Sequence, residues 1–136
     1  VLEDRRRRAE AIAAAISAAT RRRSVEVETA TTVHDFVRLL GISGASAVCL
    51  DYDLDRDGEL DKASVGDGAE AARVLVQSEH RPSVVIHSRN LLGAGRMVEI
   101  LSRSFRVAFI PCFPEIERQQ LGAIGAYIAS LEGGDR

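Results

Sequence analysis

The sequence predicts an α/β domain in which helices cover both faces of a mostly parallel, five-stranded sheet. Short apolar runs typical of strands alternate along the chain with segments whose apolar residues recur at helical spacing, and turn-forming residues separate them. The run from 45 to 50 is almost entirely apolar, as expected of a strand covered on both faces. A chain of 136 residues suits one hydrophobic core, so we expect a single domain over residues 1–136.

Each element is predicted from its local pattern. The first two residues have the character of the tail of a strand, and the first helix places Ile12 and Ile16 on one apolar face. Residues 25–28 alternate with period two, and Gly41 is expected to end the second helix. The strands are expected at residues 1–2, 25–28, 45–50, 83–86 and 107–110. The five helices are expected at residues 5–20, 31–40, 69–77, 90–101 and 114–131.

Composition and charge narrow the class of protein. Hydrophobic residues make up 46% and charged residues 28%, which is ordinary for a soluble globular domain. A formal net charge of -2 excludes a whole-protein field that would attract nucleic acid or an anionic membrane. No apolar stretch is long enough to span a bilayer, and Cys49 and Cys112, without a secretory signal, are interpreted as reduced core thiols. We therefore expect a cytoplasmic protein with no membrane partner.

The alternation of strands and helices implies right-handed crossovers and a flavodoxin-like, three-layer sandwich. The expected strand order is 2-1-3-4-5. In such sheets ligands bind beyond the carboxyl ends of the strands, near the point where the strand order reverses. Six polar residues fall at these ends: Glu3, Asp4, Asp51, Asp53, His87 and Ser88.

Acidic residues follow two of the predicted strands. Asp51 and Asp53 come after the central strand, and Glu3 and Asp4 come after the first strand. Carboxylates this close must share a cation or a proton, and a divalent metal with oxygen ligands, Mg²⁺ most simply, is the economical partner. The alternative is that these acids are solvated loop residues and helix caps.

The segment 53–64 imitates a calcium-binding loop. Acids occupy its first, third, fifth and ninth positions, and glycine occupies its sixth. The twelfth position is Ser64 rather than the bidentate glutamate that such a loop requires. This pattern favours a solvated acidic loop.

A second polar segment, His87-Ser88-Arg89-Asn90, ends an apolar strand and opens a helix. A neutral imidazole can take or give a proton, and Ser88, Arg89 and Asn90 have the groups that bind phosphoryl oxygens. The alternative is a buried histidine followed by residues that merely cap the helix. The run Arg5 to Arg8 likewise suits either phosphate or RNA contact or a solvated helix face.

The order of these motifs resembles the response-regulator receiver domain. An acidic pair follows the first strand, Asp51 follows the third, Ser88 the fourth and Pro111 the fifth. The resemblance implies that Asp51 would be the phosphoacceptor. Receivers carry a lysine directly before that proline, whereas Ile110 stands there in this chain, and the only lysine is Lys62.

The chain resembles more closely the cyclic-phosphate processing receiver family. That family's pattern of Asp-x-Asp-Leu, His-Ser-x-Asn and Gly-Ala-x-x-Met is met by segments 51–54 and 87–90 and by Gly93, Ala94 and Met97. The resemblance implies a divergent receiver fold whose acids and His-Ser-x-Asn segment handle cyclic phosphate ends of RNA or nucleotides.

The leading hypothesis is therefore a phosphoesterase that opens or hydrolyses a cyclic phosphate. Asp51 and Asp53, with Glu3 or Asp4, would hold the metal or polarise water, and His87 would be the general acid or base. Three residues would bind the phosphate: Ser88, Arg89 and Asn90. A second hypothesis is a receiver or pseudo-receiver that switches a protein partner by phosphorylation of Asp51 or by contact alone. A third is a purely structural interaction module.

Overall fold

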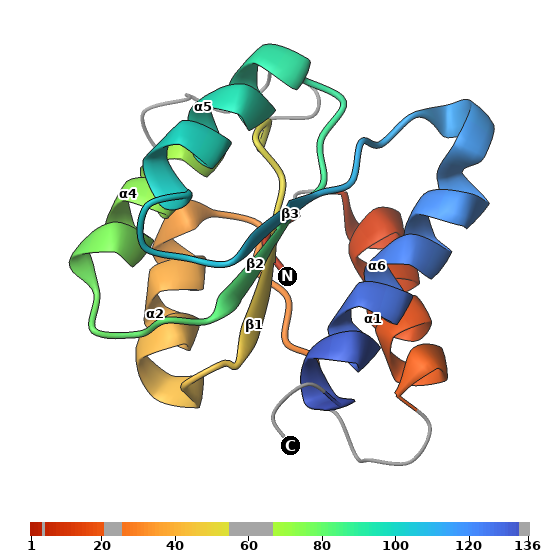
Figure 1. The fold of residues 1–136 in the computed structure, drawn as a ribbon, viewed down its shortest axis with the longest axis horizontal. Coiled ribbons are helices and arrows are strands. Elements are labelled where there is room, and N and C mark those ends of the chain that lie inside the picture. Colours follow the sequence, from red (N-terminus) through yellow and green to blue (C-terminus); the bar gives the residue numbers. More distant parts are fainter. Residues whose placement is uncertain (4, 21–25, 55–66, 134–136) are drawn as a thin grey trace.

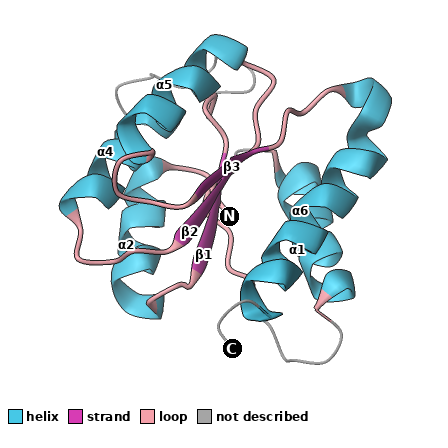
Figure 2. Ribbon diagram, in the orientation of Figure 1, coloured by secondary structure: helices cyan, strands magenta, loops and turns pink. Residues whose placement is uncertain are grey.

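The computed structural model describes residues 1–3, 5–20, 26–54 and 67–133, which form three layers, with helices on both faces of a parallel sheet (Figures 1 and 2). The elements, in chain order, are α1 (Arg6–Ala19), α2 (Val33–Ser43), β1 (Ala47–Leu50), α4 (Gly68–Gln77), β2 (Ser83–Ile86), α5 (Leu91–Leu101), β3 (Val107–Phe109), a 3-10 helix (Pro114–Ile116) and α6 (Glu117–Gly133). Most of the acidic segment that imitates a calcium loop, from residue 55 on, lies outside the described residues.

The sheet of the described residues has three strands in the order β1-β2-β3, all parallel. Two of the five predicted strands are therefore wrong as ladders. The first is reduced to Leu2, which forms isolated parallel bridges with both Leu50 and Ala30. The second, predicted at 25–28, forms no ladder over residues 26–28, although the Glu28 carbonyl accepts a hydrogen bond from the Val1 amino group at 2.8 Å. The bridge to Leu2 forms at Ala30, just beyond the predicted strand. These bridges still place the first segment between the second and β1.

Two helix ends differ from the prediction. Gly41 does not end α2, which runs on to Ser43 and closes at Gly44, the residue with a left-handed φ of 57°. The final helix begins as a 3-10 turn at Pro114 and becomes α-helical at Glu117. Proline suits such a start because it lacks the amide hydrogen that the first turn leaves unused.

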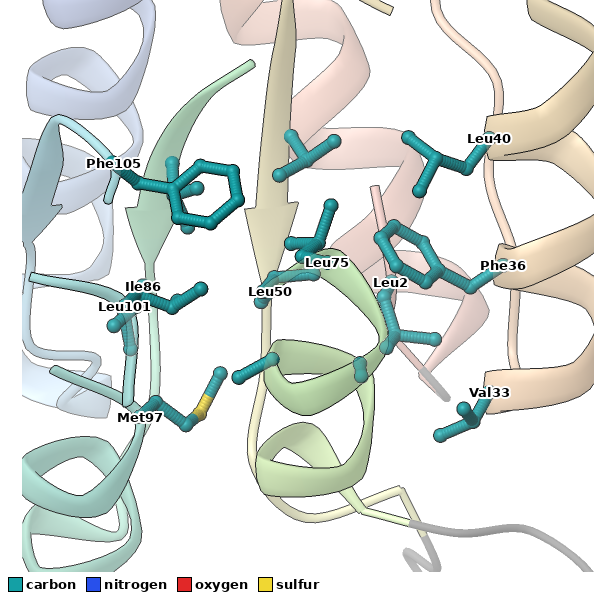
Figure 3. Close-up of a cluster of buried hydrophobic side chains, with 14 of the residues drawn as sticks. Leu2, Val33, Phe36, Leu40, Leu50, Leu75, Ile86, Met97, Leu101 and Phe105 are labelled. Carbon is teal, nitrogen blue, oxygen red and sulfur yellow. The ribbon is translucent and has the colours of Figure 1, made fainter. Parts of the chain in front are cut away.

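The core lies on both faces of the sheet because strand side chains alternate between them. Val48, Leu50 and Ile86 pack in one cluster with apolar residues of α2, α4 and α5, including Leu75 and Met97 (Figure 3). The opposite cluster joins Cys49 and Val85 to α1 and α6 through Ile12, Ile16, Ile124 and Ile128. In Figure 1, α1 and α6 lie together on one side of the sheet, and α2, α4 and α5 lie on the other.

Both cysteines of the chain, Cys49 and Cys112, are buried free thiols. No helix among the described residues is long and apolar enough to cross a bilayer. The predicted site residues meet at one edge of the sheet, at the carboxyl ends of β1 and β2.

Candidate functional site

Parallel pairing brings the two polar segments together at the carboxyl edge of the sheet. Leu50 of β1 is in register with Ile86 of β2, so Asp51 and His87, the next residue of each strand, leave the sheet side by side. Ladder-type hydrogen bonds continue past the strand ends. The His87 amide donates to the Leu50 carbonyl at 2.9 Å, and the Asp51 amide donates to the Leu2 carbonyl at 3.0 Å.

The floor of the site is a buried layer of three residues, Glu3, His87 and Ser88, whose residues are all 0% exposed. His87 Nδ1 lies 3.6 Å from Glu3 Oε2, just beyond hydrogen-bond length. Burial, with a smaller contribution from the positive charge of Arg8, lowers the pKa of His87 to about 3. The imidazole is therefore neutral at pH 7, and its contact with Glu3 is not a pair of opposite charges.

Ser88 shapes the turn between β2 and α5. Its hydroxyl oxygen accepts the Asn90 amide hydrogen at 3.1 Å, and its carbonyl accepts the Cys112 amide hydrogen at 3.1 Å. These bonds tie the start of α5 to the segment that follows β3. The predicted contact of Ser88 with phosphate stays a prediction, because in this structure its side chain has no exposed surface.

Above the buried layer lies a surface layer, defined by Asp53, Arg89 and Asn90. Asp53 and Arg89 are exposed, and Asn90 is half-buried. The Asn90 side-chain oxygen accepts the Gly93 amide hydrogen at 2.8 Å and so caps α5. This leaves the Asn90 amide nitrogen facing Asp53, to which it donates at 3.4 Å. The two polar segments, distant in sequence, are thereby linked at the surface.

Asp51 lies between the two layers. It is 6% exposed, and its Oδ1 accepts the Tyr52 amide hydrogen at 2.7 Å. A carboxylate in this position is held by the backbone yet remains at the boundary with solvent. The predicted site residues thus divide by burial: Glu3, His87 and Ser88 have no exposed surface, Asp51 is nearly buried, and Asp53, Arg89 and Asn90 reach the surface. Asp4 is not among the described residues.

Residues 1–103 match the sequence model of the family described as "Cyclic-phosphate processing Receiver domain". This stretch includes every predicted site residue. The chain belongs to the cyclic-phosphate processing receiver domain family. A solved structure of the N-terminal domain of an uncharacterized protein from Wolinella succinogenes is similar in fold to this receiver domain. The TM-score is 0.65, with 18% identity over 99% of this chain and 94% of that chain. No curated protein matches the chain.

The Gly-Ala-x-x-Met part of the receiver motif has a packing role. A side chain at Gly93 would overlap the ring of Tyr52, so the glycine lets that ring rest on the first turn of α5. A side chain at Gly68 would meet the backbone of Asp51 and Tyr52 and come within 2.8 Å of Met97 Sδ. Sequence reasoning passed over Tyr52, although an aromatic residue between two acids opposite a glycine-containing helix start was the available signal.

The carboxylates of this receiver domain face different partners. Glu3 Oε1 accepts the Arg5 amide hydrogen at 3.1 Å, while Asp53 is bonded to Asn90. Within the described residues no three His, Cys, Asp or Glu side chains are grouped as metal ligands, and Asp4 is not among those residues. The Mg²⁺ site at Glu3, Asp4, Asp51 and Asp53 therefore stays a prediction.

Proposed function

We propose that this domain binds the cyclic phosphate of a nucleotide or RNA end at the carboxyl edge of the sheet and opens it to a phosphomonoester. The observation that carries the proposal is the hydrogen bond between Asp53 and Asn90, which joins the two polar segments over the nearly buried Asp51. The family's description supports the substrate class.

The surface layer would bind the anion. Arg89 is exposed next to the helix cap, and a guanidinium can bind two phosphoryl oxygens at once. Asn90 has an amide nitrogen at the surface, where it donates to Asp53 and could donate to a phosphate. The amino end of α5, an 11-residue helix that follows Asn90, adds a favourable partial positive charge.

Asp51 would then activate water. The water oxygen forms a bond to phosphorus, its proton passes to the Asp51 carboxylate, and one bridging ester bond breaks. The oxygen that leaves takes a proton from solvent, so the product is a monoester with a free ribose hydroxyl. No step is assigned to a metal. His87 as general acid or base stays a prediction, and its full burial instead favours a positioning role beneath Asp51.

The test is incubation of the purified domain with 2′,3′-cyclic AMP, with Mg²⁺ or with EDTA, followed by separation of the monoester products. We expect turnover by the wild type and a loss on the order of 100-fold in Asp51→Asn, because a positioned base contributes that much. Glu99→Gln, an exposed acid further along α5, is the matched control and should keep full activity. Equal turnover by Asp51→Asn and wild type would rule out this mechanism.

A receiver switched at Asp51 is the second candidate function. One observation favours it: Asp51 directly follows β1, and its carboxylate is held at the edge of solvent. Against it, the position before Pro111 is Ile110, which packs against the apolar cluster of α1 and α6. Labelling by acetyl phosphate that disappears in Asp51→Asn, without turnover of the cyclic nucleotide, would favour this alternative.

A further inference from the structure

Asp51, His87 and Glu3 lie on the same side of the sheet, the side that α1 covers. Along β1 and β2, Cys49 and Val85 point toward the cluster of α1 and α6. Side chains two residues apart share a face, and the ladder-type hydrogen bonds continue for one residue past each strand. Asp51 and His87 therefore leave the sheet on the side of α1, and Glu3 lies against His87 there.

One residue of the arginine run on α1 faces inward. Arg8 is half-buried, whereas residues 5–7 are exposed. Arg8 also shares its helix face with Ile12 and Ile16, four and eight residues further on, which are buried against the sheet. Helical side chains lean toward the amino end of their helix, and α1 begins just after Glu3. This places the Arg8 side chain toward the carboxyl edge of the sheet.

The charge of Arg8 is felt by residues of the site. Burial lowers the pKa of His87, and Arg8 is the largest charged contributor to that lowering. Burial also raises the pKa of Cys112 to about 11, where Arg8 acts against the rise while Asp51 and Glu3 add to it. Arg8 and the two carboxylates thus lie within electrostatic range of the same thiol.

An anion at this site would bind more tightly with a second cation. The exposed carboxylate of Asp53 would repel a phosphate and so oppose the attraction of Arg89. The end of β3 offers no cation, because Ile110 packs into the cluster that contains Ile12. Within the described residues Arg8 has no ion pair, unlike Arg6, which lies 4.0 Å from Glu10.

We propose that Arg8 is the inner phosphate-binding cation of this site and holds the cyclic phosphate from the side opposite Arg89. The inference rests on the proposed function. It separates Arg8 from the rest of the arginine run, which is left as a solvated helix face.

The experiment measures the dissociation constant of 2′,3′-cyclic AMP by calorimetry for four forms of the full chain: wild type, Arg8→Gln, Arg8→Lys and Arg7→Gln. We expect Arg8→Gln to weaken binding about tenfold or more, since a charge-assisted bidentate contact is lost. Arg8→Lys keeps the charge and should bind more tightly than Arg8→Gln. Arg7→Gln removes the same charge from the exposed neighbour and should stay within about twofold of wild type.

A second measurement does not depend on how the variants fold. Phenylglyoxal modification of the wild-type protein, mapped by mass spectrometry, should be slowed by the cyclic nucleotide at Arg8 and not at Arg7. Unchanged binding in Arg8→Gln, or equal weakening in Arg7→Gln, overturns the inference while the proposed function stands. A folded wild type that neither binds nor turns over the nucleotide overturns the proposed function itself.

Discussion

The two layers of the site each take two residues from the same short motif, 87–90, yet these residues differ in what surrounds them. His87 and Ser88 have no exposed surface, whereas Arg89 is exposed and Asn90 half-buried. The chain turns from strand to helix between the two pairs, so adjacent residues end in different environments. The buried layer should therefore govern stability, and the surface layer should govern binding.

The largest effect expected from this comparison is that of His87→Ala. Removing a fully buried ring opens a cavity beside Glu3, which should lower the free energy of unfolding by about 2 to 4 kcal/mol. Urea unfolding measures it. His34→Ala, at an exposed histidine of α2, is the control and should change stability by less than about 0.5 kcal/mol. A loss below about 1 kcal/mol in His87→Ala would contradict the buried layer's role.

The pH dependence of stability also tests the burial of His87. The pKa of His87 is about 3 in the folded state and near the ordinary histidine value of 6.5 when the chain is unfolded, so only the unfolded state takes up its proton between these values. Stability from this group is full above pH 6.5 and falls with pH toward 3, by at most about 1.4 kcal/mol per pH unit. The control is His87→Gln, which should show a shallower slope. Identical slopes would show that His87 is accessible to protons when folded.

Gly93→Ala tests the contact between the Tyr52 ring and the first turn of α5. The added methyl group would overlap the Tyr52 ring, and the resulting shift should cost about 1 to 3 kcal/mol and weaken ligand binding. Gly95→Ala, on the same helix with open space around it, should instead stabilise by about 0.5 to 1 kcal/mol. Thermal unfolding of the pair separates the contact from helix propensity. Similar effects of the two substitutions would show that the contact of Tyr52 with Gly93 does not restrict this position.

The smallest expected stability effects are at Asn90. Asn90→Ala removes the cap of α5 and should cost about 1 kcal/mol. Asn90→Asp keeps a capping oxygen, so its stability should stay within about 0.5 kcal/mol of wild type. It replaces the amide donor with a charge beside Asp53, and cyclic nucleotide binding should therefore fall even though stability does not. If nucleotide binding and stability changed in parallel in both variants, the two layers would not have the separate roles described above.

Much of the fold could be predicted because the patterns are local. Residues 83–86 were predicted as a strand and form β2 with the same bounds, and the inward face of α1 followed from Ile12 and Ile16. The strand predicted at 25–28 failed because alternation alone does not supply a partner. Glu26 and Glu28 are exposed in the structure, and the bridge to Leu2 forms only at Ala30.

The site was predicted in position but not in depth. Residue order placed Asp51 and His87 at one edge of the sheet, which parallel register confirms. The burial of His87 and Ser88 depends on β3 and the segment after it, including the Cys112 amide bonded to Ser88, and no local pattern contains that information. The inward turn of Arg8 could have been found, because it stands four residues before Ile12 on the apolar face.

The most direct test of the two-layer account is an NMR titration of the isotope-labelled domain with 2′,3′-cyclic AMP. We expect shifts of the amide resonances of Asp53 and of residues 89–93, with smaller shifts near Arg8 and in the buried layer. Arg89→Gln should bind the nucleotide more weakly than the wild type, with an unchanged melting temperature. Absent shifts, or shifts confined to the opposite edge of the sheet near Ser46 and Ser83, would contradict the account.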